Sequence, residues 1–297
     1  MQGNTRKPRF NGDGITYFLI TLPAFGLYSF FYVYSVILGF SHSLTDWDGL
    51  SRVYNYIGFA NYAKLFAAKR YWESIRITLK YAVAIVVLTV VVGILLAVTL
   101  NSLKRFRTFI KSVFFFPTMI SAVAVALIWD QMFYRAMPTV LTMLGFQNVV
   151  SPLSNPTSAL LAVIFVNMWQ AICIPTVIFI AGLQSIPTEL YESAVIDGAR
   201  TLQQFRYITL PHLLPMVTVN AILALKSGVT AFDYAYAMTG GGPARATMLI
   251  GIKVYDDAFK SSRYSMACAE AVTLFLIIAV LSFFQTRLSS GSEVNAE

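Results

Sequence analysis

Six long apolar stretches dominate this sequence and limit what it can fold into. They span residues 15–38, 79–100, 109–133, 159–183, 209–236 and 266–286. A helix needs roughly 20 apolar residues to cross the hydrocarbon core of a bilayer, and each stretch reaches that length. Only 12% of the 297 residues are charged, about half the share found in a soluble domain. The sequence therefore predicts an all-α polytopic membrane protein with about six transmembrane helices, forming a single transmembrane domain over residues 1–297.

The basic residues indicate how the chain is oriented. The short 101–111 segment carries four Lys or Arg residues, whereas the longer 134–158 segment carries only Arg135. Cytoplasmic loops of membrane proteins are enriched in Lys and Arg. The first stretch is too long for the core of a signal peptide, so we interpret it as a retained span. With an even number of spans, both termini lie on the same side. We expect the termini and the segments 101–111 and 184–208 to be cytoplasmic, and the segment 239–263 to be outside.

Several function classes are disfavoured. The net charge of +8 comes from short basic clusters beside apolar runs and not from one stripe, which argues for membrane anchors over a nucleic-acid surface. His42 and His212 are isolated and offer neither metal-ligand spacing nor a catalytic set. Cys173 and Cys268 each stand alone in an apolar run, as buried small hydrophobes do. No metal site and no catalytic residue is predicted.

The 41–78 segment is the longest connection between spans. Tyr62, Leu65 and Phe66 follow i, i+3, i+4 spacing, with Lys64 and Lys69 elsewhere on the turn. This spacing predicts an amphipathic helix at the membrane surface. It is either a platform for a partner protein or an interface anchor.

Residues 183–211 contain helix signals where a short turn would suffice between two spans. Thr188 is a candidate N-cap, Gly198 a candidate C-terminal stop, and Thr201 with Gln204 a candidate capping box. Two short helices over 188–208 are therefore expected. A helical hairpin outside the bilayer implies that another protein docks on it.

The same segment carries a motif with many fixed positions. It consists of Glu192, Ser193, Ala194, Asp197, Gly198 and Ala199, followed by Phe205, Ile208, Leu210 and Pro211. These residues resemble the coupling loop of ABC importer permeases, whose pattern is Glu-Ala-Ala-x-x-x-Gly and then Ile-x-Leu-Pro. Ser193 departs from the family's usual alanine. The resemblance implies that coupling to an ATPase involves Glu192, Ala194, Asp197, Gly198, Ala199, Phe205 and Pro211.

Other segments narrow the subgroup. They are Gly58 to Tyr62, Pro117, Trp129, Trp169, Pro175, Ala181 to Pro187, Asp233, Thr239 to Pro243, Thr247, Tyr255 and Phe259. These positions are similar to carbohydrate-importer permeases of the maltose and glycerol-phosphate type. The family's frequent Gly-x-x-Asn turn after the third span is replaced by Arg135 to Pro138.

The resemblance implies a bacterial inner-membrane permease for a sugar or oligosaccharide, with a polyol or glycerol-phosphate-type ester as the alternative substrate. It implies a second, homologous permease subunit, two ATPase subunits and an external solute-binding protein as partners. ATP and Mg would be bound by the ATPases, because no Gly-x-x-x-x-Gly-Lys-Ser/Thr motif occurs in this chain. We expect this subunit to need no cofactor and to be no enzyme itself.

Polar residues within the spans are candidates for the substrate path, because intramembrane charges default to a functional role. They are Asn167, Gln170, Asn220, Lys226, Asp233 and Glu270. Three interpretations of Lys226 are open. It forms an ion pair with Glu270 or with a partner chain, it lines a cavity, or its side chain snorkels to the membrane interface. The three amides have a plainer alternative, which is to join helices.

Two further alternatives stay open. The glycines at 240–242 form either a tight turn or a loop that contacts substrate. A secondary transporter is the less favoured functional class, because no repeated halves or ion-coupling residues are visible.

Overall fold

The computed structural model describes residues 12–102, 107–147 and 149–293, and helices make up most of it. The described residues contain no named strand and one isolated bridge, between Thr45 and Tyr56. Within these described ranges, four helices are long and apolar enough to cross a membrane, or up to six if each of two bent helix pairs is one span. The predicted all-α polytopic fold is confirmed. Arg6, Lys7, Arg9, Lys104 and Arg105, which contribute to the predicted orientation, lie outside the described residues.

The internal contacts divide the described chain into two compact units. Unit 1 contains the residues up to Leu65 together with Asp257–Val272. Unit 2 contains Phe66–Asp256 and the residues from Thr273 onward.

Unit 1 begins with one continuous helical run. It consists of α1 (Gly12–Tyr28), the π-helical turn η1 (Ser29–Val33) and α2 (Tyr34–Ser43). From Tyr17 onward this run is 27 residues long, sufficient to cross a bilayer. It passes Pro23 without a break and continues beyond the predicted end at residue 38.

The end of α2 is held by α3 (Ala60–Ala67), the short helix predicted around Tyr62. Asn61 donates hydrogen bonds from Nδ2 to the carbonyl oxygens of Ser43, at 2.9 Å, and Thr45, at 2.7 Å. The Tyr62 hydroxyl lies 2.7 Å from Ser43 Oγ. The bond to Ser43 satisfies a carbonyl group that the end of α2 leaves without an intrahelical partner.

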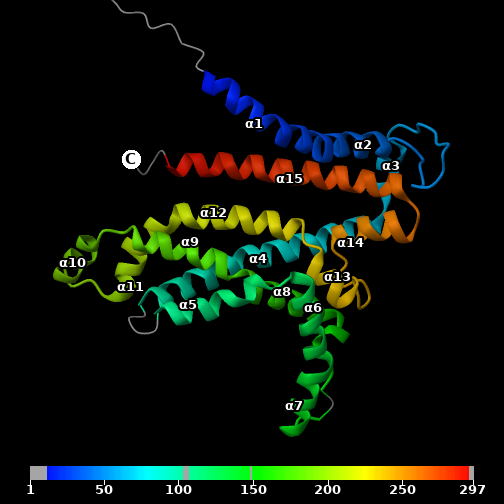
Figure 1. Ribbon diagram of the computed structural model, residues 1–297. Helices are drawn as coiled ribbons and strands as arrows, with labels where there is room; N and C mark the ends of the chain where they lie inside the picture. Colours follow the sequence, from blue (N-terminus) through cyan, green and yellow to red (C-terminus); the bar gives the residue numbers. More distant parts are fainter. Residues whose placement is uncertain (1–11, 103–106, 148, 294–297) are drawn as a thin grey trace, which may run out of the picture. The chain divides into compact units, whose positions relative to one another are not determined.

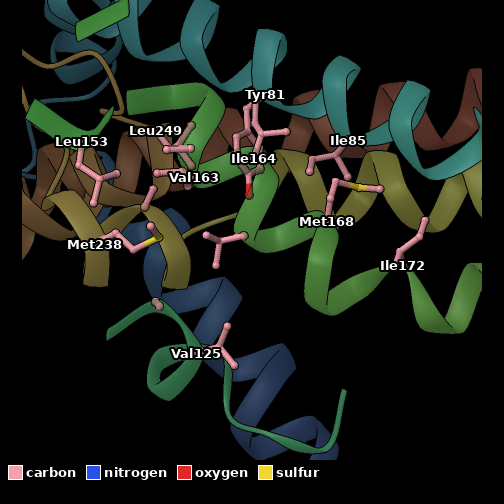
Figure 2. Packing of buried hydrophobic residues seen from close by; sticks show 14 of the residues in the cluster. Tyr81, Ile85, Val125, Leu153, Val163, Ile164, Met168, Ile172, Met238 and Leu249 are labelled. Carbon is pink, nitrogen blue, oxygen red and sulfur yellow. The ribbon is translucent and has the colours of Figure 1, made fainter. Parts of the chain in front are cut away.

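Unit 2 is organised around α4 (Lys69–Ser102), which begins ten residues before the predicted span. It packs against α12 (Leu210–Val229) and α9 (Cys173–Gln184). The buried cluster in Figure 2 joins α4, through Tyr81 and Ile85, to α8 (Pro156–Ala171), through Ile164 and Met168.

Two of the predicted spans are broken in the structure. The 109–133 stretch contains α5 (Arg107–Phe115), the 3-10 turn η2 (Phe116–Met119) and α6 (Ala122–Gln131), with a bend of 99° before α6. The stretch at 159–183 is divided into α8 and α9, bent by 51°. Pro117 and Pro175 lie at these breaks, where proline removes a backbone donor. Figure 1 shows α6 running across the direction of α4.

The other elements complete the two ends of unit 2 and the last span. They are η3 (Met132–Ala136), α7 (Met137–Met143), η4 (Pro152–Ser154), α10 (Thr188–Ile196), α11 (Thr201–Gln204), η5 (Phe205–Thr209), α13 (Asp233–Thr239), α14 (Ile250–Tyr255), η6 (Asp256–Lys260) and α15 (Tyr264–Glu293). Helix α12 ends at Val229 and not at 236. Thr230 is its C-cap, and the N–H and Oγ1 of Thr230 both bind the Lys226 carbonyl. Figure 1 shows α10 and α11 at one end of unit 2 and α13 at the other.

Candidate functional site

The segment with the coupling-loop motif forms the predicted helical hairpin. Helix α10 is followed by Gly198 in the left-handed conformation, with φ of 74°. The Gly198 N–H binds the Val195 carbonyl at 3.0 Å, and the Ala199 N–H binds the Ala194 carbonyl at 2.8 Å. This pair of bonds is the Schellman arrangement, which favours glycine at the left-handed position. The prediction that Gly198 stops the first helix is confirmed.

The predicted caps are each displaced by one residue. Pro187 is the N-cap of α10, with ψ of 134°, so Thr188 is already helical and makes no capping bond. In α11 the N-cap is Arg200 and not Thr201. Its N–H donates to Gln203 Oε1 at 2.7 Å, so Gln203 takes the role predicted for Gln204. Extended backbone at Pro187 and Arg200 sets both helix starts.

The hairpin is fastened to the helix that follows it. The hydroxyls of Tyr191, in α10, and Thr209, in η5, lie 2.8 Å apart. Phe205 packs against the buried cluster that includes Phe179 and Leu213. From Thr201 to Val229 the helical run is unbroken for 29 residues, with Pro211 in the first turn of α12. Sequence reasoning missed the Tyr191–Thr209 contact, because neither residue belongs to the motif.

The outer side of the hairpin is exposed and partly apolar. Glu192 and Asp197 are exposed, whereas Ala194 and Ala199 are partly buried. Large apolar side chains lie beside them, with Ile196 86% and Leu202 77% exposed. An exposed apolar surface with acidic residues on an ordered hairpin is typical of a protein-docking site.

Two of the span amides are hydrogen-bonded between helices. Asn167 donates to the Tyr81 hydroxyl at 2.7 Å. Gln170 donates from Nε2 to the Ile120 carbonyl at 2.6 Å and accepts from the Tyr234 hydroxyl at 2.8 Å. Both amides are about 95% buried. Their geometry matches the plainer alternative, in which they join helices.

Asn220 is also buried, on α12. Its Nδ2 reaches the Pro175 carbonyl at 3.5 Å, a long hydrogen bond, and its Oδ1 has no partner. Pro175 lies in α9, just beyond the bend between α8 and α9. Asn220 thus connects α12 to the broken span by this long bond, and its own Oδ1 remains available as an acceptor.

The charged candidates differ in their exposure. Lys226 and Asp233 are exposed, and neither side chain has a hydrogen bond or ion pair within the described part of unit 2. Glu270, in unit 1, is fully buried.

The glycines at 240–242 form a tight turn beside a cavity of about 360 Å³. Gly240 and Gly241 have φ of 57° and 91°, a region that glycine adopts readily. The hydroxyl of Thr247 bonds to the Gly242 carbonyl at 2.7 Å and lies 2.6 Å from Thr239 Oγ1. Threonine hydroxyls thus fix this loop, and Thr239 lines the cavity.

Comparison with known proteins places the chain among transport proteins. Residues 89–293 match the family described as "Binding-protein-dependent transport system inner membrane component". The multiple sugar-binding transport system permease protein MsmF of Streptococcus mutans is 40% identical over 89% of this chain and 91% of its own length. The probable starch degradation products transport system permease protein AmyD of Thermoanaerobacterium thermosulfurigenes is 32% identical over 97% of this chain and 99% of its own length.

The fold matches as well. A bacterial ABC transporter chain involved in alginate import superposes with a TM-score of 0.80, covering 94% of this chain and 96% of that one, at 23% identity. The helical hairpin, the bent spans and the match to the family profile agree with one another. The chain belongs to the binding-protein-dependent transport system inner membrane components and is a permease subunit of an ABC importer.

Proposed function

We propose that this permease forms half of the translocation path for a sugar or oligosaccharide. The main support for this proposal is the ordered hairpin at 188–209. It exposes an apolar and acidic surface, and the contact between Tyr191 and Thr209 fastens it to a span. The substrate class is supported by the relatives named for multiple sugars and for starch degradation products.

The hairpin can transmit movement because it continues into a span. At 1.5 Å per residue, the unbroken run from Thr201 to Val229 is roughly 43 Å long. A partner that displaces α10 would therefore tilt α12 as well. In this proposal Glu192, Ala194, Asp197, Gly198 and Ala199 contact or shape the docking surface. Phe205 and Pro211 join it to the span.

The chemistry belongs to partner subunits in this proposal. Two ATPase subunits bind ATP and Mg and engage the hairpins of this chain and of a second, homologous permease. An external solute-binding protein delivers the substrate at the opposite end of unit 2, near the Thr239–Pro243 loop. Both termini and the hairpin lie on the cytoplasmic side of the inner membrane.

Reconstituted transport tests the proposal directly. Proteoliposomes containing the full complex should take up labelled oligosaccharide only when ATP and the binding protein are supplied. Gly198→Val places a β-branched residue at φ of 74°, a conformation that such residues strongly disfavour. We expect uptake and substrate-stimulated ATP hydrolysis to fall at least ten-fold, since misplacement of a positioned contact costs rate steeply.

Gly145→Val is the matched control. Gly145 also has a left-handed backbone, with φ of 92°, and an added Cβ would meet no atom within 4 Å, as at Gly198, but it lies outside the hairpin. The two variants therefore share backbone strain and differ in location. Equal loss of coupling in both variants would contradict the assigned role. Uptake of glycerol 3-phosphate or a polyol instead of oligosaccharide would establish the alternative substrate, and uptake driven by an ion gradient would establish a secondary transporter.

A further inference from the structure

A groove of about 910 Å³ follows the exposed side of α4 in unit 2. Trp72, Arg76 and Lys80 line its N-terminal half, and Leu79, Val83 and Val87 continue it toward the middle of the span. The groove therefore changes from basic to apolar along a single helix. Neither the hairpin nor the amide contacts of the spans involve it.

The two cations lie one helical turn apart on α4. Arg76 and Lys80 are exposed, and within the described part of the chain neither forms an ion pair, not even with Glu73 on the same helix. Like charges at i and i+4 repel each other. Their placement is unfavourable until an anion lies between them.

The apolar half offers a continuous surface to a hydrocarbon chain. Leu79, Val83 and Val87 repeat every four residues and are all exposed, so they form one stripe along the helix. From Lys80 to Val87 the helix rises about 10 Å, most of the depth of one hydrocarbon leaflet. The stripe and the two cations together match an amphiphile with an anionic head.

Trp72 marks the level of the membrane interface. Its Nε1 donates to the Phe66 carbonyl at 2.9 Å, which fixes the indole at the basic end of the groove. Tryptophan is enriched at the head-group level of membranes. Arg76 and Lys80 follow it by one and two turns, within reach of lipid phosphates.

We propose that this groove binds one anionic phospholipid, with its phosphate between Arg76 and Lys80 and one acyl chain along Leu79, Val83 and Val87. Unpaired cations above an apolar surface complement such a lipid on both counts. If a helix of the second permease covered this groove instead, that helix would have to place carboxylates beside Arg76 and Lys80. The proposal requires only insertion of the chain in a membrane and does not depend on what the complex transports.

Native mass spectrometry of the purified full complex tests the site. Dioleoylphosphatidylglycerol should bind more tightly than dioleoylphosphatidylcholine. Each cation near an anionic lipid contributes about a five-fold factor in affinity. The double variant Arg76→Gln with Lys80→Gln should therefore reduce phosphatidylglycerol affinity about 30-fold and leave phosphatidylcholine affinity unchanged.

Two controls keep the result interpretable. Arg76→Lys with Lys80→Arg preserves both charges and should keep the preference, so a loss through misfolding is recognised. Arg135→Gln removes the cation from a comparable apolar groove on α6 and α7 and should have little effect. Soluble glycerol 3-phosphate should not compete, since it lacks the acyl chain; competition would reassign the site to free phosphate esters.

Three further outcomes would overturn the proposal. The first is equal wild-type affinity for the two lipids, and the second is an unchanged preference in the double Gln variant. The third is cross-linking of Arg76→Cys to the second permease in the assembled complex with no lipid retained, which would make the groove a subunit interface.

Discussion

The close approach of α12 to α4 in unit 2 leads to a stability prediction. A Cβ added to Gly228 of α12 would lie 2.6 Å from the Cα and 2.9 Å from the Cβ of Ala82 in α4. Ordinary contacts between carbon atoms are about 3.5–4.0 Å, so the two helices would have to separate by about 1 Å. We therefore expect Gly228→Ala to destabilise the protein even though it adds only one methyl group.

The magnitude follows from two opposing effects. Overpacking against a backbone atom costs about 1–3 kcal/mol, and we take the upper value because Ala82 Cα cannot rotate away. Alanine gains about 1 kcal/mol over glycine in helix propensity. The net loss is about 2 kcal/mol, which corresponds to an apparent Tm about 4–8 °C lower.

Thermal unfolding in detergent measures this change. Gly26→Ala is the control, because Gly26 lies in α1 with no atom within 4 Å of its added Cβ, and it should leave the Tm unchanged or slightly higher. Ala82→Gly in the Gly228→Ala background removes the 2.9 Å contact but keeps the 2.6 Å contact, so rescue should be partial. An unchanged Tm for Gly228→Ala would refute the close approach of α4 and α12, and full rescue would refute the role of the backbone atom.

Three further predictions concern the spans and the topology. Gln170→Leu should destabilise the complex by about 1–3 kcal/mol in detergent unfolding. The Tyr234 hydroxyl loses its acceptor, and interhelical hydrogen bonds in membranes contribute about 0.6–1.7 kcal/mol each. An unchanged stability would show that these hydrogen bonds do not stabilise the fold. Leu202→Cys and Ala244→Cys, on a cysteine-free background, should react with an impermeant reagent from opposite sides of the membrane, and labelling from one side would contradict the proposed topology. If Lys226 lines the substrate path, the Lys226→Met complex should assemble normally but show a changed apparent affinity for the transported substrate. Reduced assembly would indicate an ion pair with a partner chain. No change in either property would leave only snorkelling to the interface.

The features predictable from the sequence are those that local chemistry determines. The apolar stretches identify the spans because their lengths match a bilayer. Gly198 identifies a helix stop because the left-handed position after a helix favours glycine. The caps were predicted one residue away from their observed positions. The fixed geometry of Pro187 already starts α10, so Thr188 falls inside the helix.

The bend in the third predicted span was not predictable in the same way. Bilayer helices often contain proline without breaking, as α1 does at Pro23. Around Pro117 the outcome depends on a partner far away in sequence, because Gln170 binds the Ile120 carbonyl and Thr118 Oγ1 binds the Gln170 carbonyl at 3.2 Å. A sequence contains both residues but does not show that they meet.

These contacts explain why span amides are ambiguous as markers of a substrate path. A broken span exposes carbonyl groups where water is scarce, and leaving them unsatisfied costs several kcal/mol each. The Gln170 amide and the Cys173 thiol, which donates to the Phe114 carbonyl at 2.9 Å, meet this need beside the third span. A polar group close to a break is therefore expected, first of all, to form hydrogen bonds with the carbonyl groups that the break leaves unsatisfied. Lys226 and Asp233, which are exposed and repair no break, are the stronger candidates for contact with substrate or with the second permease.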